Sequence, residues 1–254
     1  MDLGEAAEKF GFVTSPVGSH TRRSIAVNEL RKLLAACGPR ATYAEIRHLA
    51  LDENILGKVT QSSRVNTFRV LREFYALHLD VPVYSGLRFF WDYDEKEQPL
   101  LALLCASARD PVLRESAAVV LPWPQGTALP KKPLEDNLRA VYASHYNESM
   151  LAQITRKLLS SWTQAGHLTG RTTKIRGRAH SGPAATAYAL FLGYLTGARG
   201  NALFTTFWVQ VLDAPLQEVH QNAFTASKMG WLDYKNAGGV TEVGFYAPLI
   251  NTST

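Results

Sequence analysis

The sequence predicts a mainly α-helical protein: a helical bundle that carries helix-turn-helix-like or winged-helix-like modules and one or two short β-hairpins. Apolar residues recur at the three- and four-residue spacing of amphipathic helices along most of the 254-residue chain. Capping residues precede several of these periodic runs and mark where helices begin. Short β-rich runs on either side of glycine-containing turns predict the hairpins.

The composition is that of an ordinary globular protein, with 46% hydrophobic and 19% charged residues. The two cysteines, Cys37 and Cys105, form no CxxC pair, which argues against a disulfide scaffold or a zinc knuckle. Such sparse cysteine usage is typical of the reducing cytosol. Because the first residues also lack the apolar segment of a signal peptide, we expect a cytoplasmic protein.

The first part of the chain predicts a loosely ordered arm at residues 1–21 and an N-terminal helical domain at residues 22–121. Apolar periodicity indicates a first helix soon after residue 22, and Thr42 with Glu45 forms a capping box for the second. Three consecutive helices fit a helix-turn-helix module, and they fit a plain helical bundle with a solvated basic face as well.

The third helix of this domain carries the basic face. The sequence predicts that Ser62 or Ser63 caps this helix and that Val65 is buried together with the neighbouring apolar residues. Its exposed cations form a second candidate DNA surface, made of Arg64, Arg69 and Arg72.

Residues 81–99 predict an extended or loop-like segment with an acidic cluster, for which we expect a solvated turn rather than a metal site. A helical run follows, broken at Asp110-Pro111, where the aspartate caps a new helix. The proline-rich stretch 122–133 predicts a linker. Residues 131–254 predict a C-terminal helical domain with a basic wing-like segment and a terminal β-hairpin. The acidic cluster comprises Asp92, Asp94, Glu95 and Glu97.

The net charge of +5 is concentrated in one part of the chain. Residues 149–212 hold seven basic side chains and no acidic one. Local positive charge without acids is typical of a site for a polyanion such as nucleic acid. Within the C-terminal domain, two amphipathic helices precede the basic segment HLTGRTTKIRGR, which is the order of a winged helix.

We therefore predict double-stranded DNA as a partner, with basic side chains on the phosphates and polar side chains of the second helix in a groove. The alternative is a flexible basic loop that has no partner. The predicted phosphate contacts are Arg156, Lys157, Arg171, Lys174, Arg176 and Arg178, and the predicted groove contacts are Gln153, Ser160 and Gln164.

The apolar run at residues 183–198 has sixteen residues without a charge, fewer than the roughly 20 that a membrane-spanning helix needs. We expect it to form bundle core and expect no membrane partner. At the C-terminus, a helix capped by Asp213 and a hairpin around Gly238 and Gly239 again resemble a winged helix. A structural cap on the bundle fits equally well, because this helix carries no basic cluster.

The sequence contains no Walker A, dinucleotide-binding, zinc-protease or nucleophile-elbow motif. Its seven histidines form no paired-ligand spacing with one another or with cysteine. We therefore expect a binding protein rather than an enzyme, with no cofactor, no metal and no small-molecule substrate.

Five phrases within residues 50–246 carry a resemblance to a known family. They are ENILGKVTQSSRVNTFRVLREFY, PLLALLCASARDPVLRESA, SSWTQAGHLTGRTTKIR, ALFLGYLTGARGNALF and GWLDYKNAGGVTEVGF. Together they resemble the BrxA family of bacterial BREX phage-exclusion systems, which is often labelled as an inner membrane protein. The resemblance implies a mainly helical, non-enzymatic DNA-binding protein, similar in some members to the antitermination factor NusB. It also implies antiviral defence beside other BREX proteins, among them a methyltransferase, an ATPase and a phosphatase-like protein.

Two other classes of function stay open at this point. A protein–protein adaptor would dock the basic patch on an acidic partner within a defence complex, and a steep salt dependence of DNA binding would distinguish a DNA-binding protein from it. A membrane-associated protein is the third class, and fractionation without detergent tests it.

Overall fold

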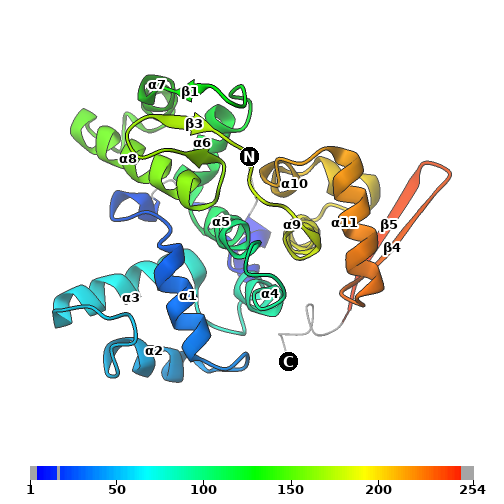
Figure 1. The fold of residues 1–254 in the computed structure, drawn as a ribbon, viewed down its shortest axis with the longest axis horizontal. Helices are drawn as coiled ribbons and strands as arrows, with labels where there is room; N and C mark the ends of the chain where they lie inside the picture. The colour runs from blue at the N-terminus through cyan, green and yellow to red at the C-terminus, as the bar shows by residue number, and fades with distance from the viewer. Residues whose placement is uncertain (1–4, 16–17, 247–254) are drawn as a thin grey trace.

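The computed structural model describes residues 5–15 and 18–246. Within these ranges the chain is mainly α-helical with a few short antiparallel strands, as the sequence predicts (Figure 1). Buried apolar side chains from both predicted helical domains belong to a single core cluster. The division into domains at residues 121 and 131 stays a prediction.

The first half of the chain folds around α5 (Gln98–Arg109), which is buried along most of its length. This helix packs against α3, α4, α6 and α9. The elements around it are η1 (Glu5–Phe10), η2 (Ser19–Thr21), α1 (Val27–Ala36), α2 (Tyr43–Leu51), α3 (Gln61–Tyr75), α4 (Pro82–Phe90) and α6 (Pro111–Val120).

The structure forms two of the helix caps that the sequence predicts in this half. The predicted capping box of Thr42 and Glu45 forms at the start of α2. Asp110 caps α6, and its side chain accepts a hydrogen bond from the Leu113 N–H at 2.8 Å. The cap of α3 is Thr60 rather than either of the two serines predicted for it.

Besides the cap of α3, the predictions for residues 81–99 and for Val65 are wrong. The segment predicted as extended contains α4, because Pro82 fits the first helical position and the apolar residues behind it pack into the core. Val65 is 46% exposed, since α3 turns its other apolar side chains, such as Phe68 and Leu71, towards α5.

The segment predicted as a loosely ordered arm makes specific contacts where the structure describes it. Phe12 is buried and packs against Trp208, with ring centroids 5.4 Å apart. His20 is fully buried and bonds to Asp110 and Ser161. The described residues of this segment are therefore packed against the body of the protein rather than held loosely.

The middle of the chain combines two helices with a small sheet. Strand β3 (Lys174–Arg176) pairs antiparallel with β1 (Ala128–Leu129) on one side and β2 (Leu168–Thr169) on the other. Between β1 and β2 lie α7 (Lys131–Tyr142) and α8 (Glu148–Gln164), and the Asn147 side chain caps α8. The stretch predicted as a linker thus contains a strand and the start of α7.

Helix α9 (Pro183–Leu195) is the apolar run of the sequence, and most of its residues are fully buried. The Glu97 carboxylate accepts hydrogen bonds from three N–H groups at its N-terminus: Gly182 at 3.0 Å, Ala184 at 3.4 Å and Ala185 at 2.7 Å. Glu97 is therefore buried and holds a helix terminus, which corrects its assignment to a solvated turn. Among the described residues, no helix combines the length and apolarity needed to span a membrane.

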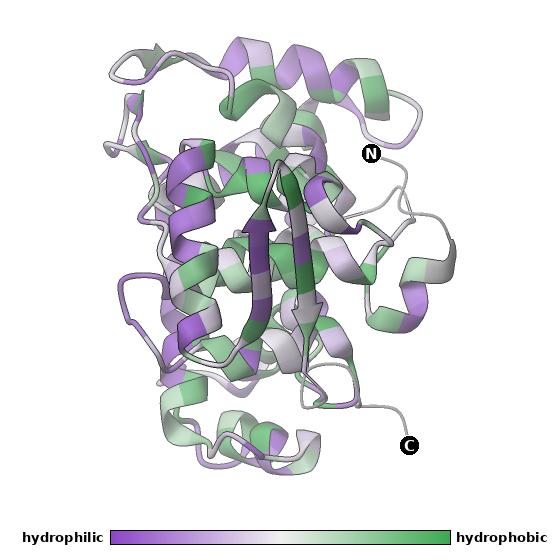
Figure 2. Ribbon diagram, turned by 90° about the vertical axis from the view of Figure 1, so that its right-hand side faces the viewer, coloured by the Kyte–Doolittle hydropathy of each residue, from purple (hydrophilic) through white to green (hydrophobic). Residues whose placement is uncertain are grey.

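The C-terminal elements follow as η3 (Gly200–Thr205), α10 (Phe207–Val211), α11 (Leu216–Lys228), β4 (Leu232–Ala237) and β5 (Val240–Phe245). The last two form the predicted hairpin, with Gly238 and Gly239 at positive φ in its turn. Figure 2 looks onto this hairpin and shows hydrophilic residues along much of β4. Asp213 does not cap α11, which begins after Pro215.

Candidate nucleic-acid interface

The basic segment forms a wing, which we define as β2, β3 and the turn between them at residues 170–173. Gly170 has a φ of +87°, and a Cβ atom there would lie 2.2 Å from the carbonyl oxygen of Thr173. Only glycine fits this turn. The turn places Arg171 at the tip of the wing, where the residue is exposed.

Arg176 does not belong to the exposed surface, which corrects its prediction as a phosphate contact. Its side chain is 1% exposed at the base of the wing. The guanidinium donates to the carbonyl oxygens of Val120 at 2.8 Å and Leu121 at 3.2 Å, and it pairs with Asp213 at 2.8 Å. Surrounded in this way, it cannot reach a phosphate. It anchors the wing to the end of α6 and to the turn before α11.

Arg178 is exposed but already has partners. Its Nε donates to the carbonyl oxygen of Asp213 at 2.8 Å, and its terminal nitrogen pairs with Glu218 at 2.6 Å. Because a carboxylate neutralises its charge, Arg178 is a weaker candidate for phosphate binding than the unpaired cations of the wing.

Four cations from α7, α8 and the wing meet in one groove, which we call the basic groove. Its volume is about 680 Å³, and it lies between α8, the wing and the start of α7. Among the described residues, neither an acidic nor an aromatic side chain lines it. Arg156 and Arg171 make no hydrogen bond or ion pair with another described residue. The four groove cations are Lys131, Arg156, Arg171 and Lys174.

Lys174 is the most enclosed of these four. Its ammonium donates to the carbonyl oxygen of Gly170 at 2.7 Å, which ties the wing turn together. Burial lowers its pKa from the ordinary value. The sequence prediction omitted Lys131, because it lies in the stretch interpreted as a linker. Only the pairing of β1 with β3 brings it beside the wing.

The remaining side chains predicted on α8 divide into an exposed group and a bound group. Gln153 is exposed, one turn before Arg156. The Lys157 ammonium donates to the carbonyl oxygen of Thr21 at 2.6 Å. Burial, and next the charge of Arg156, lower the pKa of Lys157. Its position is therefore fixed by the fold, while its charge adds to that of the groove.

Ser160 and Gln164 are both engaged within the protein. The Gln164 amide nitrogen donates to Ser160 Oγ at 3.2 Å and to Ser24 Oγ at 2.9 Å. Its amide oxygen accepts from the Val27 N–H at 3.0 Å. Ser160 also lines the basic groove and can still contact a ligand there, whereas Gln164 serves to hold the chain before α1.

The chain before α1 crosses α8 as a strap, which we define as residues 18–26. His20 lies within it, with Nδ1 3.0 Å from Asp110 Oδ2 and Nε2 2.8 Å from Ser161 Oγ. Aspartate, histidine and serine in this order resemble the triad of serine hydrolases. All three side chains are fully buried, and Ser161 Oγ also accepts from the Ile25 N–H at 3.1 Å. The arrangement holds the strap in place, since no substrate can reach the hydroxyl.

The second predicted surface on α3 contains two exposed cations. Arg69 donates to Asn66 on the same helix at 2.8 Å, and Arg72 has no polar partner among the described residues. Arg64 is half-buried and donates to the carbonyl oxygen of Leu51 at 3.3 Å, so it supports the contact between α2 and α3. Arg69 and Arg72 are therefore the exposed cations of α3.

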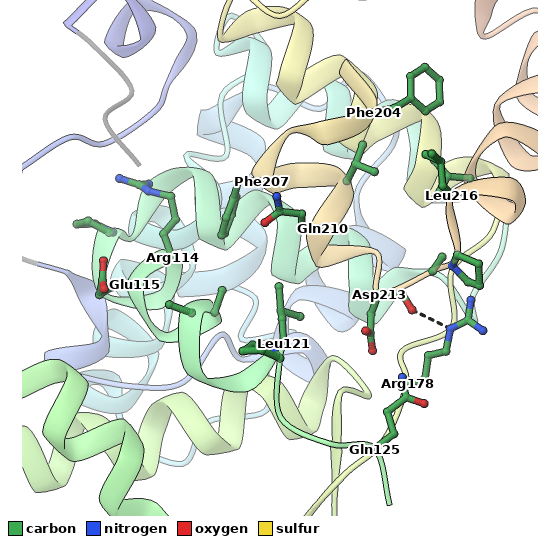
Figure 3. Close-up of a pocket in the computed structure, with 18 of the residues that line it drawn as sticks. Arg114, Glu115, Leu121, Gln125, Arg178, Phe204, Phe207, Gln210, Asp213 and Leu216 are labelled. Carbon is green, nitrogen blue, oxygen red and sulfur yellow. Dashed lines mark hydrogen bonds between the residues drawn. The ribbon is translucent and has the colours of Figure 1, made fainter. Parts of the chain in front are cut away.

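A second, neutral groove of about 1210 Å³ lies on another side of the wing base. Figure 3 shows Arg114 and Glu115 of α6 on one wall and Phe207, Gln210 and Asp213 on the other. Its positive and negative side chains balance, and its rim includes Leu216, which is 54% exposed, and Val141, which is 46% exposed. This composition suits a protein surface rather than a polyanion.

The comparison with protein families found a match over part of the chain. Residues 18–121 match the BrxA family. The resemblance seen in the sequence is confirmed over this segment, which comprises the strap and α1 to α6, and the BrxA family implies a component of a BREX phage-defence system. The basic groove lies outside the matched residues. No curated protein matches the chain.

The described residues contain no group of three or more histidine, cysteine, aspartate or glutamate side chains placed to hold a metal ion. The basic groove is the candidate site in which cations gather, and it lies outside the segment that matches the BrxA family.

Proposed function

We propose that this protein is a cytoplasmic, non-enzymatic DNA-binding component of a BREX system, and that the basic groove holds the backbone of duplex DNA. The observation that carries the proposal is the meeting of four cations from α7, α8 and the wing in a groove without a carboxylate. Arginine and lysine in such a setting bind phosphate oxygens through charge-assisted hydrogen bonds.

The arrangement of the elements supports the same function. Two helices, a short hairpin and a third strand beside it resemble a winged helix, with α8 in the position of the recognition helix and β2–β3 as the wing. In helix-turn-helix proteins the recognition helix contacts base edges, while flanking groups hold the phosphates. Gln153 and Arg156 are the side chains of α8 that point outward for such contacts.

The groove favours a duplex over a single strand. Proteins that bind single strands place aromatic side chains in a basic channel, so that unpaired bases stack on them. In the part of the chain that the structure describes, no aromatic residue lines the basic groove. Its cations can bind the sugar–phosphate backbone but offer no surface on which an unpaired base would stack.

The test is fluorescence anisotropy with a labelled duplex of ~20 bp at several salt concentrations. Four phosphate contacts give a log–log salt slope of about −3.6. Changing all four groove cations to alanine removes this contribution and weakens binding by at least about 100-fold at 0.1 M salt. The matched control changes four exposed cations elsewhere, namely Lys96, Arg199, Lys228 and Lys235.

Equal binding by the two quadruple variants, both folded, would rule out the groove as the DNA site. A wild-type protein without measurable DNA affinity would leave the second candidate function, an adaptor for other BREX proteins. The neutral groove favours this second candidate, because its exposed Leu216 and Val141 resemble the apolar contacts at the centre of protein interfaces.

A further inference from the structure

The strap connects the two basic surfaces that the sequence presents as separate. Its η2 turn packs against both α8 and α3, and Figure 1 shows it between these two helices. Lys157 of α8 donates to the carbonyl oxygen of Thr21 in the strap at 2.6 Å. On the other side, the Arg23 guanidinium donates to Thr67 Oγ1 of α3 at 3.0 Å. The strap therefore links α8, which lines the basic groove, to α3.

Two arginines of the strap face outward over this junction. Arg22 pairs with Glu73 of α3, and Arg23 pairs with Glu29 at 3.3 Å. The arginine side chains are 50% and 42% exposed, whereas Glu73 and Glu29 are only 23% and 18% exposed. Because the carboxylates lie beneath the guanidinium groups, an approaching phosphate meets the cations first.

The charges along this path form what we call the basic belt. It begins at the four groove cations, crosses α8 at Lys157, continues over Arg22 and Arg23 of the strap, and ends at Arg69 and Arg72 of α3. Packed elements lie about 10 Å apart, so a path from the wing across α8 and the strap to α3 measures about 30 Å. This is close to the length of one turn of B-DNA, about 34 Å.

We propose that Arg22 and Arg23 are further DNA contacts, and that they join the groove and α3 into one track along a single duplex. This inference rests on the proposed function. In the bound state the two arginines exchange their carboxylate partners for phosphates. Glu73 therefore acts as an internal competitor that weakens DNA binding, whereas Glu29 also pairs with Lys58 at 3.0 Å and keeps that partner when Arg23 leaves.

The experiment compares three variants on the 20-bp duplex: the groove quadruple variant, the strap variant R22Q/R23Q and the α3 variant R69Q/R72Q. If the belt is one track, the strap and α3 variants each lower the magnitude of the salt slope by about 1.8, which corresponds to two phosphates. Each weakens binding by about tenfold or more at 0.1 M salt, while the control K228A/K235A leaves it unchanged. Circular dichroism establishes that each variant is folded.

Two further measurements make the test specific. On a hairpin-closed duplex of ~6 bp, about 20 Å long, the groove variant still weakens binding, whereas the α3 variant no longer does. The variant Glu73→Gln removes the competitor of Arg22 and strengthens binding to the 20-bp duplex severalfold, an effect that damage to the fold would not produce.

The outcomes distinguish the belt from the proposed function. Loss of binding in the groove variant alone, with the strap and α3 variants equal to the control, overturns the belt and leaves the groove as the DNA site. Loss of binding in the strap and α3 variants, with the groove variant equal to the control, overturns both. Weaker or unchanged binding by Glu73→Gln contradicts the exchange of partners at Arg22.

Discussion

The role of each basic side chain depends on what surrounds its charged group. Lys174 and Arg176 are two positions apart on the same strand, so they lie on one face of β3. Lys174 is near the tip of the wing and lines the basic groove, whereas Arg176 is at the base and is buried against the end of α6. The order of residues in this segment does not show that Lys174 is available to a partner whereas Arg176 stabilises the fold.

We expect Arg176→Ala to lower the free energy of unfolding by about 3 kcal/mol. The substitution leaves Asp213 without its ion pair and several buried carbonyl groups without a donor. Arg178→Ala, which removes a half-exposed pair in the same segment, should cost less than about 1 kcal/mol. Urea unfolding measures both. If R176A were as stable as wild type and lost DNA affinity, Arg176 would be a DNA contact after all.

Residues within or next to a helix cap its N-terminus in several cases, whereas in one case a residue far away in the sequence does so. The capping residues at α2, α6 and α8 act within their own helices. Helix α9 is different, because the carboxylate that caps it belongs to the residue before α5, 85 positions away from Gly182. The sequence around Glu97 shows only that it is one of several neighbouring acidic residues, and it does not show that Glu97 caps α9.

The variant Glu97→Gln should destabilise the protein by about 2 kcal/mol at neutral pH. The amide has one acceptor oxygen and turns its NH₂ group towards N–H donors at the start of α9, where a negative charge is favoured. Urea unfolding measures the loss, and hydrogen exchange at the Ala185 amide locates it. The control is Glu95→Gln, a change of the same chemistry at an exposed position. Equal stability of the two variants would show that Glu97 does not hold α9.

At the scale of the whole molecule, the buried node of His20, Asp110 and Ser161 joins the strap to α6 and α8. It fixes the position of the strap and with it the path of the basic belt. Burial raises the pKa of Asp110, but the nearby His20 and the hydrogen bonds to the carboxylate outweigh burial and lower the pKa below 3.8.

This shift gives the node a defined pH dependence. A carboxyl group with a lowered pKa stabilises the folded state at pH values above its ordinary pKa, and the contribution disappears as the pH falls through the folded value. We expect Asp110→Asn to lower the free energy of unfolding by about 2 kcal/mol at pH 7, and the difference from wild type to shrink below about pH 4. Urea unfolding between pH 3 and 7 measures this, with Asp52→Asn as the exposed control. A difference that stayed constant with pH would contradict a charged Asp110.

The sequence by itself determined the mainly helical class, several helix starts, the terminal hairpin and the part of the chain in which positive charge gathers. These features depend on short-range periodicity, on capping and on composition, all of which a local window contains. Only the tertiary structure decided which cations are free. It buried Arg176, engaged Lys157 and Gln164 with the strap, brought Lys131 beside the wing, and placed Arg22 between α8 and α3. Burial and long-range pairing depend on residues that are far apart in the chain. Such contacts produce no periodic pattern in the sequence from which they could be predicted.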